Sequence, residues 1–357
     1  MSLHFHPLTI KSVVLETTDC ITATLNIPEQ LADIFKHKEG QYLTFRKTID
    51  GEEVRRSYSI CRAPFENELT VAIKRVSGGL FSNMANDEFK KGYAIDVMPP
   101  TGNFTAKLNN ENPNYLAIAA GSGITPIISI IKQTLHTDPH SRFTLIYGNK
   151  NRGSIIFFEA LEELKNRYME RFTLVHILSR EKMDAEISHG RINTDKLKSL
   201  AQLVPFNRFA SAYICGPENM ILESSAFLQE QGMEKSNIHF ELFGTAESYK
   251  KNKSVELDET EAGPKSKITI RLDGRSSSFE LAYNSKSILD AALKEGADLP
   301  FACKGGVCCT CRAKVIEGQV SMDVNYALEP EEVEQGFILT CQAHPLTETV
   351  VIDFDQK

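Results

Sequence analysis

Four cysteines near the end of the chain constrain its fold more than any other feature. Cys303 and Cys308 have four residues between them, Cys308 and Cys311 have two, and Cys341 follows after 29 more. Two irons bridged by two sulfides need four thiolates, two for each iron. A tight loop presents three of them if its backbone bends sharply, and the fourth comes from a distant segment. The spacing therefore predicts a [2Fe-2S] cluster held by these four cysteines.

The neighbours of these cysteines support the cluster but leave alternatives. Gly305 and Gly306 permit the sharp bends that such a loop needs. A zinc site or buried free thiols are the competing interpretations, but structural zinc sites prefer paired Cys-x-x-Cys knuckles and only one pair here has that spacing. Cys309 is a surplus thiol. It is either a small residue under the loop, or a weak hydrogen-bond donor or substitute ligand for the cluster.

Length, charge and cysteine usage limit the class of protein. The 357 residues suggest two or three domains. The net charge of −7 argues against nucleic acid or an anionic membrane as the main partner, and no apolar run approaches the ~20 residues that span a bilayer. The first fifteen residues are typical of a strand rather than a signal peptide. Because the cysteines are clustered rather than evenly paired, we expect a reducing compartment, the cytoplasm.

The first hundred residues have the pattern of a small β-barrel. Residues 21–27 alternate apolar and polar side chains, as a half-buried strand does. Further strands are expected at residues 41–44, 55–60, 69–75 and 93–98. Many short strands separated by turn residues predict an antiparallel barrel.

The middle of the chain alternates strands and helices. Strands are expected at residues 115–120, 143–147, 172–178, 211–215 and 239–243. Between them are helical patterns, in one of which Phe157, Leu161, Leu164 and Tyr168 share a face. This alternation predicts a parallel, doubly wound sheet.

A charged, apolar-poor stretch from residue 245 to 266 then predicts a flexible linker. The last ~90 residues form a third unit, with strands at 267–272 and 349–354 and a helix at 288–295. The expected domains are therefore residues 1–108, 109–245 and 266–357, with a linker at 246–265.

Two segments of the middle region have the chemistry of a dinucleotide site. In AAGSGITP, residues 119–126, Gly121 and Gly123 let the backbone approach a diphosphate, and the helix that follows attracts anions at its N-terminus. Cys215-Gly216-Pro217 ends a later strand, where open α/β sheets bind ligands. Each segment alone is also compatible with a plain strand-to-helix turn.

Two weaker patterns suggest further ligand contacts. Ser179-Arg180 and Arg191 have the groups that clamp the 2′-phosphate of NADP, although they can equally be solvated surface residues. In the barrel, Arg56-Ser57-Tyr58-Ser59 places an arginine beside an aromatic ring, and residues 78–82, Gly-Gly-Leu-Phe-Ser, form a glycine-rich turn into a short helix. A flavin suits both features, but an ordinary strand and turn would contain them too.

Taken in order, RSYS, GGLFS, GSGITP and CGP resemble the ferredoxin–NADP reductase superfamily, and the appended cysteine-rich domain resembles the reductase components of multicomponent oxygenases. The segments that carry the resemblance are SYSICR, AAGSGITP, LIYGN, HGRI, ICGP, DLPFACKGGVCCTCRAKV, NYALEP and VIDFD. They cover essentially the whole chain. The resemblance implies a multidomain fold: an antiparallel β-barrel flavin domain, an α/β parallel-sheet nucleotide domain and an α+β (β-grasp) [2Fe-2S] ferredoxin domain.

The resemblance also implies roles for single residues. Arg56 should meet flavin phosphate, Tyr58 and Ser59 the isoalloxazine, and Phe243 the flavin edge. Thr125 should lie between flavin and nicotinamide, and Ser59 and Cys215 should act where hydride is transferred. The full set of implied flavin contacts is Arg56, Ser57, Tyr58, Ser59, Lys74, Gly79, Leu80, Phe81, Ser82 and Phe243. The implied nucleotide contacts are Gly121, Ser122, Gly123, Thr125, Ser179, Arg180, Arg191, Cys215, Gly216 and Pro217.

The function implied by the resemblance is electron transfer from NADPH through FAD and a [2Fe-2S] cluster to the di-iron oxygenase subunits of a multicomponent complex. FAD is favoured over FMN, although one branch with the same domain order uses FMN. The acceptor can instead be another oxygenase or a fatty-acyl desaturase. A non-enzymatic iron–sulfur carrier or assembly scaffold is a third hypothesis, which leaves the first ~245 residues unexplained.

Overall fold

The computed structural model describes residues 4–109, 111, 113–182, 185–243, 264–283 and 285–356. Most of the expected linker, residues 246–263, lies outside the described residues. The chain divides into two compact units. One is His6–Phe243, and the other contains the C-terminal residues from 264 onward together with residues 4 and 5.

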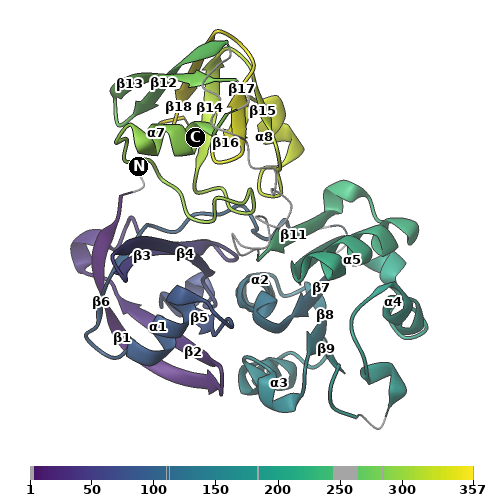
Figure 1. The fold of residues 1–357 in the computed structure, drawn as a ribbon. Coiled ribbons are helices and arrows are strands. Elements are labelled where there is room, and N and C mark those ends of the chain that lie inside the picture. Colours follow the sequence, from purple (N-terminus) through teal and green to yellow (C-terminus); the bar gives the residue numbers. More distant parts are fainter. Residues whose placement is uncertain are drawn as a thin grey trace. The chain divides into compact units, whose positions relative to one another are not determined.

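The first part of the larger unit is an antiparallel barrel, as the strand pattern predicts (Figure 1). Its sheet has the order β4-β3-β6-β1-β2-β5. A bridge between Ile60 and Val71 joins the two ends of this order. The elements are β1 (His6–Thr17), β2 (Cys20–Asn26), β3 (Tyr42–Ile49), β4 (Glu52–Ser59), β5 (Thr70–Lys74), α1 (Leu80–Glu88) and β6 (Ala94–Val97).

The second part of this unit is a five-stranded parallel sheet of order β11-β10-β7-β8-β9. Helices α2 and α3 cover the face nearer the barrel, and α4 and α5 cover the other face (Figure 1). This confirms the predicted doubly wound sheet. The elements are β7 (Asn114–Ala120), α2 (Ile124–Thr137), β8 (Arg142–Asn149), α3 (Phe158–Arg167), β9 (Phe172–Leu178), α4 (Thr194–Leu200), β10 (Ser211–Gly216), α5 (Glu218–Glu230) and β11 (Ile238–Leu242).

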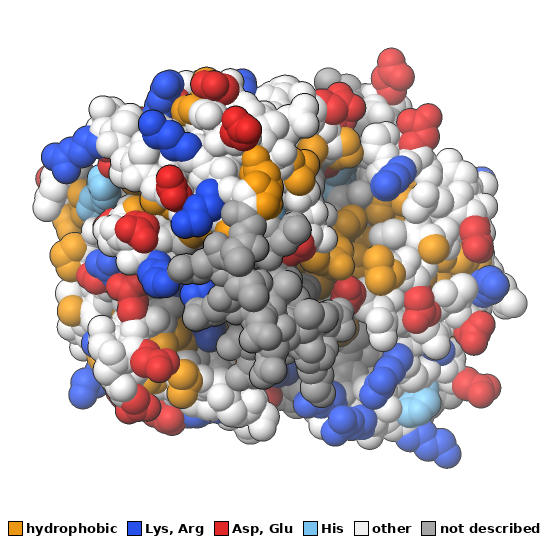
Figure 2. Space-filling model, turned by 45° about the horizontal axis from the view of Figure 1, so that its top comes forward, with side chains coloured by type: hydrophobic (Ala, Val, Ile, Leu, Met, Phe, Trp, Pro, Cys, Tyr) orange, Lys and Arg blue, Asp and Glu red, His pale blue; other side chains and the backbone are white. Residues whose placement is uncertain are grey.

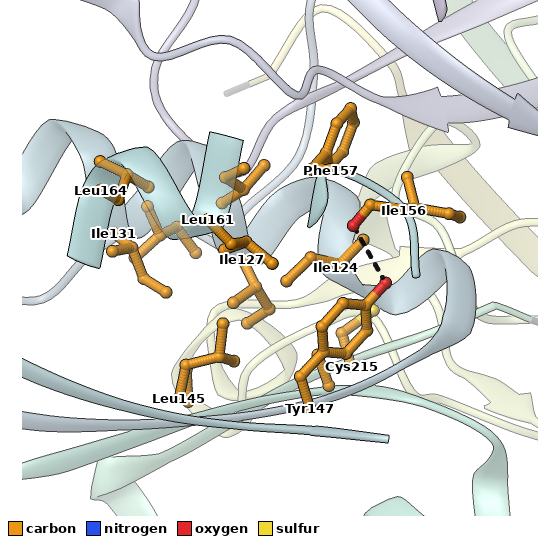
Figure 3. Packing of buried hydrophobic residues seen from close by; sticks show 14 of the residues in the cluster. Ile124, Ile127, Ile131, Leu145, Tyr147, Ile156, Phe157, Leu161, Leu164 and Cys215 are labelled. Atoms are coloured by element: carbon orange, nitrogen blue, oxygen red, sulfur yellow. Dashed lines mark hydrogen bonds between the residues drawn. The ribbon is translucent and has the colours of Figure 1, made fainter. Parts of the chain in front are cut away.

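The helical pattern around residue 160 differs in one respect from the prediction. Leu161 and Leu164 pack into the core from α3, as expected (Figure 3). Phe157, however, precedes the helix and has a left-handed backbone, with φ 62°. A residue in that conformation cannot continue a right-handed helix, and Tyr168 follows the last helical residue, so the apolar periodicity extends one residue beyond each end of the helix.

A small 3-10 helix, η2 (Pro64–Glu66), joins the barrel to the parallel sheet by packing on α2. The Glu66 carboxylate lies 3.0 Å from Lys132 Nζ and 3.2 Å from Arg62 Nη1. The Phe65 ring stacks on His136 with ring centroids 4.0 Å apart. Charged and stacked contacts therefore fix α2, which follows the glycine-containing loop at residues 121–123, against the barrel.

The smaller unit has a mixed sheet of order β13-β12-β18-β14-β16, in which only β12 and β18 pair in parallel. Ser287 caps α7, because its side chain accepts from the Asp290 N–H. This ferredoxin-like α+β arrangement agrees with the expected fold class. The elements are β12 (Lys265–Leu272), β13 (Arg275–Ala282), α7 (Ile288–Lys294), β14 (Arg312–Glu317), β15 (Val320–Met322), α8 (Pro330–Glu334), β16 (Phe337–Leu339), β17 (Ala343–Pro345) and β18 (Thr349–Asp353).

The face of the molecule in Figure 2 carries interspersed acidic and basic side chains, with hydrophobic side chains between them. Within the described ranges, no helix is long and apolar enough to cross a bilayer. The cytoplasmic location stays a prediction.

Three histidines that are buried or half-buried make the larger unit sensitive to acid. Burial lowers the pKa of His37, His176 and His239, and that of His239 to about 4. An unfolded histidine titrates near 6.5, so the unfolded chain binds protons first as the pH falls. The stability from neutral His239 is thus complete above about pH 6.5 and is lost between about pH 6.5 and 4.

We expect the melting temperature of the larger unit to fall over this range, and the His239→Phe variant to show a shallower fall, because phenylalanine cannot be protonated beside Tyr213. Melting curves at pH 7.5, 6.5, 5.5 and 4.5 measure the effect. His140→Gln, at an exposed position, is the control. Parallel curves for wild type and His239→Phe would contradict the assignment.

Candidate functional site

The carboxyl ends of the five parallel strands lie along one edge of the sheet, because all five run in the same direction. Open α/β sheets bind ligands at this edge. The expected nucleotide contacts follow or end these strands. Gly121 follows β7, Ser179 follows β9 and Cys215 lies at the end of β10. The topology therefore brings together residues that are almost one hundred positions apart.

The loop at residues 121–123, between β7 and α2, is called the dinucleotide loop after its expected ligand, and its shape depends on its two glycines. Gly121 has φ +54°, a conformation that favours glycine. A Cβ on Gly123 would lie 2.1 Å from the Cys215 carbonyl oxygen, so the loop can sit against β10 only without a side chain there. Thr125 is buried, and its hydroxyl donates to Ser122 O at 3.0 Å. The threonine thus holds the loop in shape. Its place between two bound rings stays a prediction.

Cys215 is fully buried on β10. Burial, and then the charge of Glu241, raise the pKa of its thiol well above the ordinary value, so the group stays neutral at physiological pH. Gly216 follows at a tight position, where a Cβ would lie 2.6 Å from Met220 Cε. Pro217 immediately precedes α5. The Cys-Gly-Pro segment therefore presents a neutral thiol and a compact backbone at the strand end.

A hydrogen bond across the larger unit joins the barrel to the sheet edge. Ser59 at the end of β4 donates from Oγ to Glu241 Oε2 at 3.2 Å. Glu241 is the register partner of Cys215 on the neighbouring strand. Ser59, Cys215 and Glu241 are thus a connected group drawn from three strands.

Glu241 is absent from the residues that the sequence pattern picked out. Its available signal was its position near the end of the last expected parallel strand, two residues before Phe243. The Phe243 side chain is 41% exposed and lies just beyond β11, at the same sheet edge.

Apart from Phe243, the expected flavin contacts lie on β4, on β5 and around the start of α1, and they divide into outward and inward side chains. Arg56 and Leu80 are exposed. Phe81 is buried with its ring centroid 5.7 Å from that of Tyr58, and Ser82 Oγ accepts from Val76 N at 3.1 Å. The side chains of Phe81 and Ser82 therefore shape the turn from within, and a ligand there would meet its backbone.

Other members of this set have local partners. Ser57 Oγ lies 3.0 Å from Thr44 Oγ1, and Lys74 Nζ lies 3.6 Å from an Asp19 carboxylate oxygen. Gly79 precedes α1 directly, so its backbone lies at the helix N-terminus, which favours anions. The flavin roles of these residues stay predictions.

The three candidate 2′-phosphate contacts come from two neighbouring segments. Leu178 bridges to His189, and Gly190 N donates to Leu178 O at 2.9 Å, which places Ser179-Arg180 next to Gly190-Arg191 in the fold. Both arginines are exposed, and Ser179 Oγ donates to Asn149 O at 3.2 Å. The arrangement suits a doubly charged anion, and its assignment to NADP stays a prediction.

The four spaced cysteines of the smaller unit form two pairs. Cys303 Sγ and Cys308 Sγ lie 3.1 Å apart, and Cys311 hydrogen bonds to Cys341. These bonds are the leading cause that lowers the pKa of Cys303 and of Cys341. Two thiol pairs suit a two-iron cluster, in which each iron takes two thiolates. Among the described residues, no three His, Cys, Asp or Glu side chains gather as a site for a single metal ion.

Gln342 holds the cysteine loop to the turn between β16 and β17, which contains Cys341. Its side-chain amide donates to Lys304 O and to Cys341 O, both at 3.0 Å. Lys304 has φ +53°, a strained conformation for a residue with a side chain, and Gly305 N next to it donates to Cys303 Sγ at 3.3 Å. Gln342 was not identified from the sequence, since a glutamine after a cysteine has no distinctive pattern.

Comparisons with known proteins agree with this layout. Three family models match the chain: an oxidoreductase FAD-binding domain at residues 7–106, an oxidoreductase NAD-binding domain at 117–225 and a 2Fe-2S iron-sulfur cluster binding domain at 270–346. The chain belongs to the family of oxidoreductases that join these three domains, and the expected cofactors FAD, a nicotinamide nucleotide and a [2Fe-2S] cluster are those of the family.

Among its relatives is a component of the 1,2-phenylacetyl-CoA epoxidase of Escherichia coli (strain K12), which is 46% identical over 99% of this chain and 98% of the relative. The ferredoxin reductase component of a 3-ketosteroid-9-alpha-monooxygenase from Rhodococcus rhodochrous is 34% identical over 97% of this chain and 96% of its own. The phthalate dioxygenase reductase structure covers 98% of each chain at 23% identity with a TM-score of 0.57, which shows a shared fold. The sequence motifs most resemble the reductase component of the epoxidase, and the first comparison confirms that resemblance.

We expect the Gln342→Leu variant to hold its cluster less firmly, because leucine leaves two carbonyl oxygens without their donor. Loss of a buried partner costs about 1–3 kcal/mol, which in a domain of this size lowers the melting temperature by about 5–15 °C. The temperature at which the visible absorbance of the cluster bleaches is the measurement. Gln335→Leu, at an exposed position, is the control. Equal bleaching temperatures for all three proteins would contradict the role of Gln342.

Proposed function

We propose that this chain is the reductase component of a 1,2-phenylacetyl-CoA epoxidase, and that it supplies electrons from NADPH, through FAD and a [2Fe-2S] cluster, to a di-iron oxygenase. The observation that carries the proposal is the 46% identity to the E. coli component over nearly the whole of both chains. The 3-ketosteroid monooxygenase reductase, at 34% identity, supports an oxygenase as the class of acceptor. The di-iron type rests on the resemblance of the motifs.

The chain's own residues suit this work. When bound, the flavin accepts two electrons together as hydride and the cluster passes on one at a time. Neutral, buried Cys215 and the Ser59–Glu241 hydrogen bond supply an uncharged sulfur and a fixed hydroxyl at the sheet edge. They position reactants and move no proton as a required step. Arg56 and the N-terminus of α1 offer positive charge for flavin phosphates.

We also propose the domain boundaries expected above, with a flavin domain at residues 1–108, a nucleotide domain at 109–245, a linker at 246–265 and a ferredoxin domain at 266–357. The three matched family segments fall inside the three proposed domains. Cys303, Cys308, Cys311 and Cys341 are the proposed cluster ligands. Their two close pairs support that proposal.

An anaerobic titration of the purified protein with NADPH tests the electron route. We expect the flavin absorbance to bleach and the EPR signal of a reduced [2Fe-2S] cluster to follow. In the Cys303→Ser variant the flavin should still bleach while that EPR signal is lost, because one iron has lost a thiolate. The route is wrong if NADPH leaves the wild-type flavin oxidised, or if the flavin is reduced while an intact cluster never is.

A second titration distinguishes the possible electron acceptors. The reduced protein is mixed with the purified oxygenase subunits of the E. coli epoxidase and with phenylacetyl-CoA. Substrate-dependent oxidation of the reduced protein supports the epoxidase, and oxidation only by a different oxygenase or a desaturase assigns another acceptor.

The nucleotide preference depends on Arg180 and Arg191. Replacing either arginine with alanine removes a charge-assisted contact to a 2′-phosphate, which is worth about 1.5–3 kcal/mol. We expect kcat/KM for NADPH to fall about 10–100-fold and that for NADH to stay within about twofold. Stopped-flow flavin reduction with both nucleotides gives the two constants, and Arg142→Ala, at the start of β8, is the control. An equal fall in kcat/KM for NADPH and NADH would show that the arginines contact a portion of the nucleotide that both molecules contain, and not the 2′-phosphate.

A further inference from the structure

Tyr147 is among the largest fully buried side chains of the larger unit, and its hydroxyl contacts the dinucleotide loop. It lies on β8 and is completely buried beside Cys215 (Figure 3). Its hydroxyl donates to Gly121 O at 2.9 Å and lies 3.4 Å from Ile156 O. The proton is thus shared between the first glycine of the loop and the segment before α3. Without this donor, the buried Ile156 carbonyl oxygen would lose a partner, and the half-buried Gly121 carbonyl oxygen would keep the Ile124 N–H.

The peptide group between Ile156 and Phe157 contacts Tyr147 on one side and the barrel on the other. In a trans peptide the C=O and N–H point opposite ways. The carbonyl faces the Tyr147 hydroxyl, while the Phe157 N–H donates to Glu16 Oε1 at 2.8 Å. Glu16 lies on β1 of the barrel. One peptide group therefore connects a barrel carboxylate to a tyrosine that holds the dinucleotide loop.

The backbone at Phe157 shows that this orientation is imposed. Phe157 has φ 62° although it carries a large side chain, and that conformation is unfavourable for any residue but glycine. Strain of this kind persists only where surrounding contacts hold it. Leu161 and Leu164 anchor α3 on the core, so a return of Phe157 to ordinary φ would turn its peptide group away from Glu16 and Tyr147. The two hydrogen bonds and the packing of α3 hold the strained turn together.

We propose that Glu16 and Tyr147 are positioning residues for the nicotinamide nucleotide. Through the Ile156–Phe157 peptide they fix the Gly121 loop relative to the barrel, and so set how firmly the loop binds the nucleotide diphosphate. The negative charge of Glu16 polarises the peptide, which strengthens its carbonyl as an acceptor for Tyr147. Neither side chain touches the nucleotide. This inference rests on the proposed use of a nicotinamide nucleotide.

The test uses the full-length, flavin-loaded protein and two probes, NADP⁺ and 2′-AMP. The second probe carries the 2′-phosphate but has no 5′-phosphate, so it reports on the arginine segment and not on the Gly121 loop. We expect Tyr147→Phe and Glu16→Ala each to raise the dissociation constant for NADP⁺ and the KM for NADPH about tenfold. The dissociation constant for 2′-AMP and the kcat should stay within about threefold of wild type.

The conservative variant and the double variant sharpen the test. Glu16→Gln keeps an acceptor oxygen for the Phe157 N–H and should recover most of the NADP⁺ affinity. Because both residues act through one peptide group, Tyr147→Phe with Glu16→Ala should weaken binding little more than either alone, far from the product of the two effects. Tyr168→Phe and Glu29→Ala, which lie outside this chain of contacts, are the controls and should bind as wild type.

The outcomes separate this inference from the proposed function. Unchanged NADP⁺ affinity in both single variants, equal weakening of both probes, or multiplied effects in the double variant would each overturn it. If Tyr147→Phe does not fold, Glu16→Ala and Glu16→Gln decide alone, since Glu16 is only half-buried. A wild-type protein whose flavin no nicotinamide nucleotide reduces would refute the proposed function itself.

Discussion

A backbone contact that only glycine permits underlies the nucleotide half of the site. Gly123 lies so close to the Cys215 carbonyl that a single added carbon would overlap it. Through this contact the loop after β7 rests on the end of β10, beside the strand that carries Glu241. The thiol, the carboxylate and the loop therefore share one edge of the sheet, and the Ser59 hydroxyl reaches them from the barrel. Each of these groups is in place because two backbone segments meet without a side chain between them.

The fold could be predicted from the sequence where the signals depend on neighbouring residues. Alternating strand patterns, the glycine-rich turn after β7 and the cysteine spacing each depend on neighbouring residues, and the barrel, the parallel sheet and the ferredoxin-like unit follow from them. Some strand ends differ from the prediction by a few residues. The strand expected at residues 41–44, for example, is β3 and extends to Ile49. The bounds of the long strand β1 could not be predicted from alternation, because its burial pattern is irregular around two register shifts.

Parts of the site depend on contacts between distant residues, and those were not accessible from the sequence. Glu241 meets Ser59 across 182 positions and Glu16 meets Phe157 across 141, and none of these side chains stands in a motif that names its partner. The inward orientation of Phe81 also required the fold, because a glycine-rich turn does not say which side chains close it from within. The sequence motifs indicated which segments are expected to bind ligands, and the tertiary contacts showed which residues hold those segments in position.

The division of the four spaced cysteines between a loop and a distant strand end has a consequence for how the protein matures. Cys303 and Cys308 approach each other within one loop, whereas Cys311 directly precedes β14 and Cys341 follows β16, and these two strands pair. One half of the proposed ligand set is thus local, and the other half depends on the pairing of two strands. Since a metal group that needs both halves adds its binding free energy to folding, iron and sulfide incorporated into this domain act as a check on its assembly. A chain that has acquired its cluster has, by that fact, already brought the loop at residues 303–311 and the turn after β16 together.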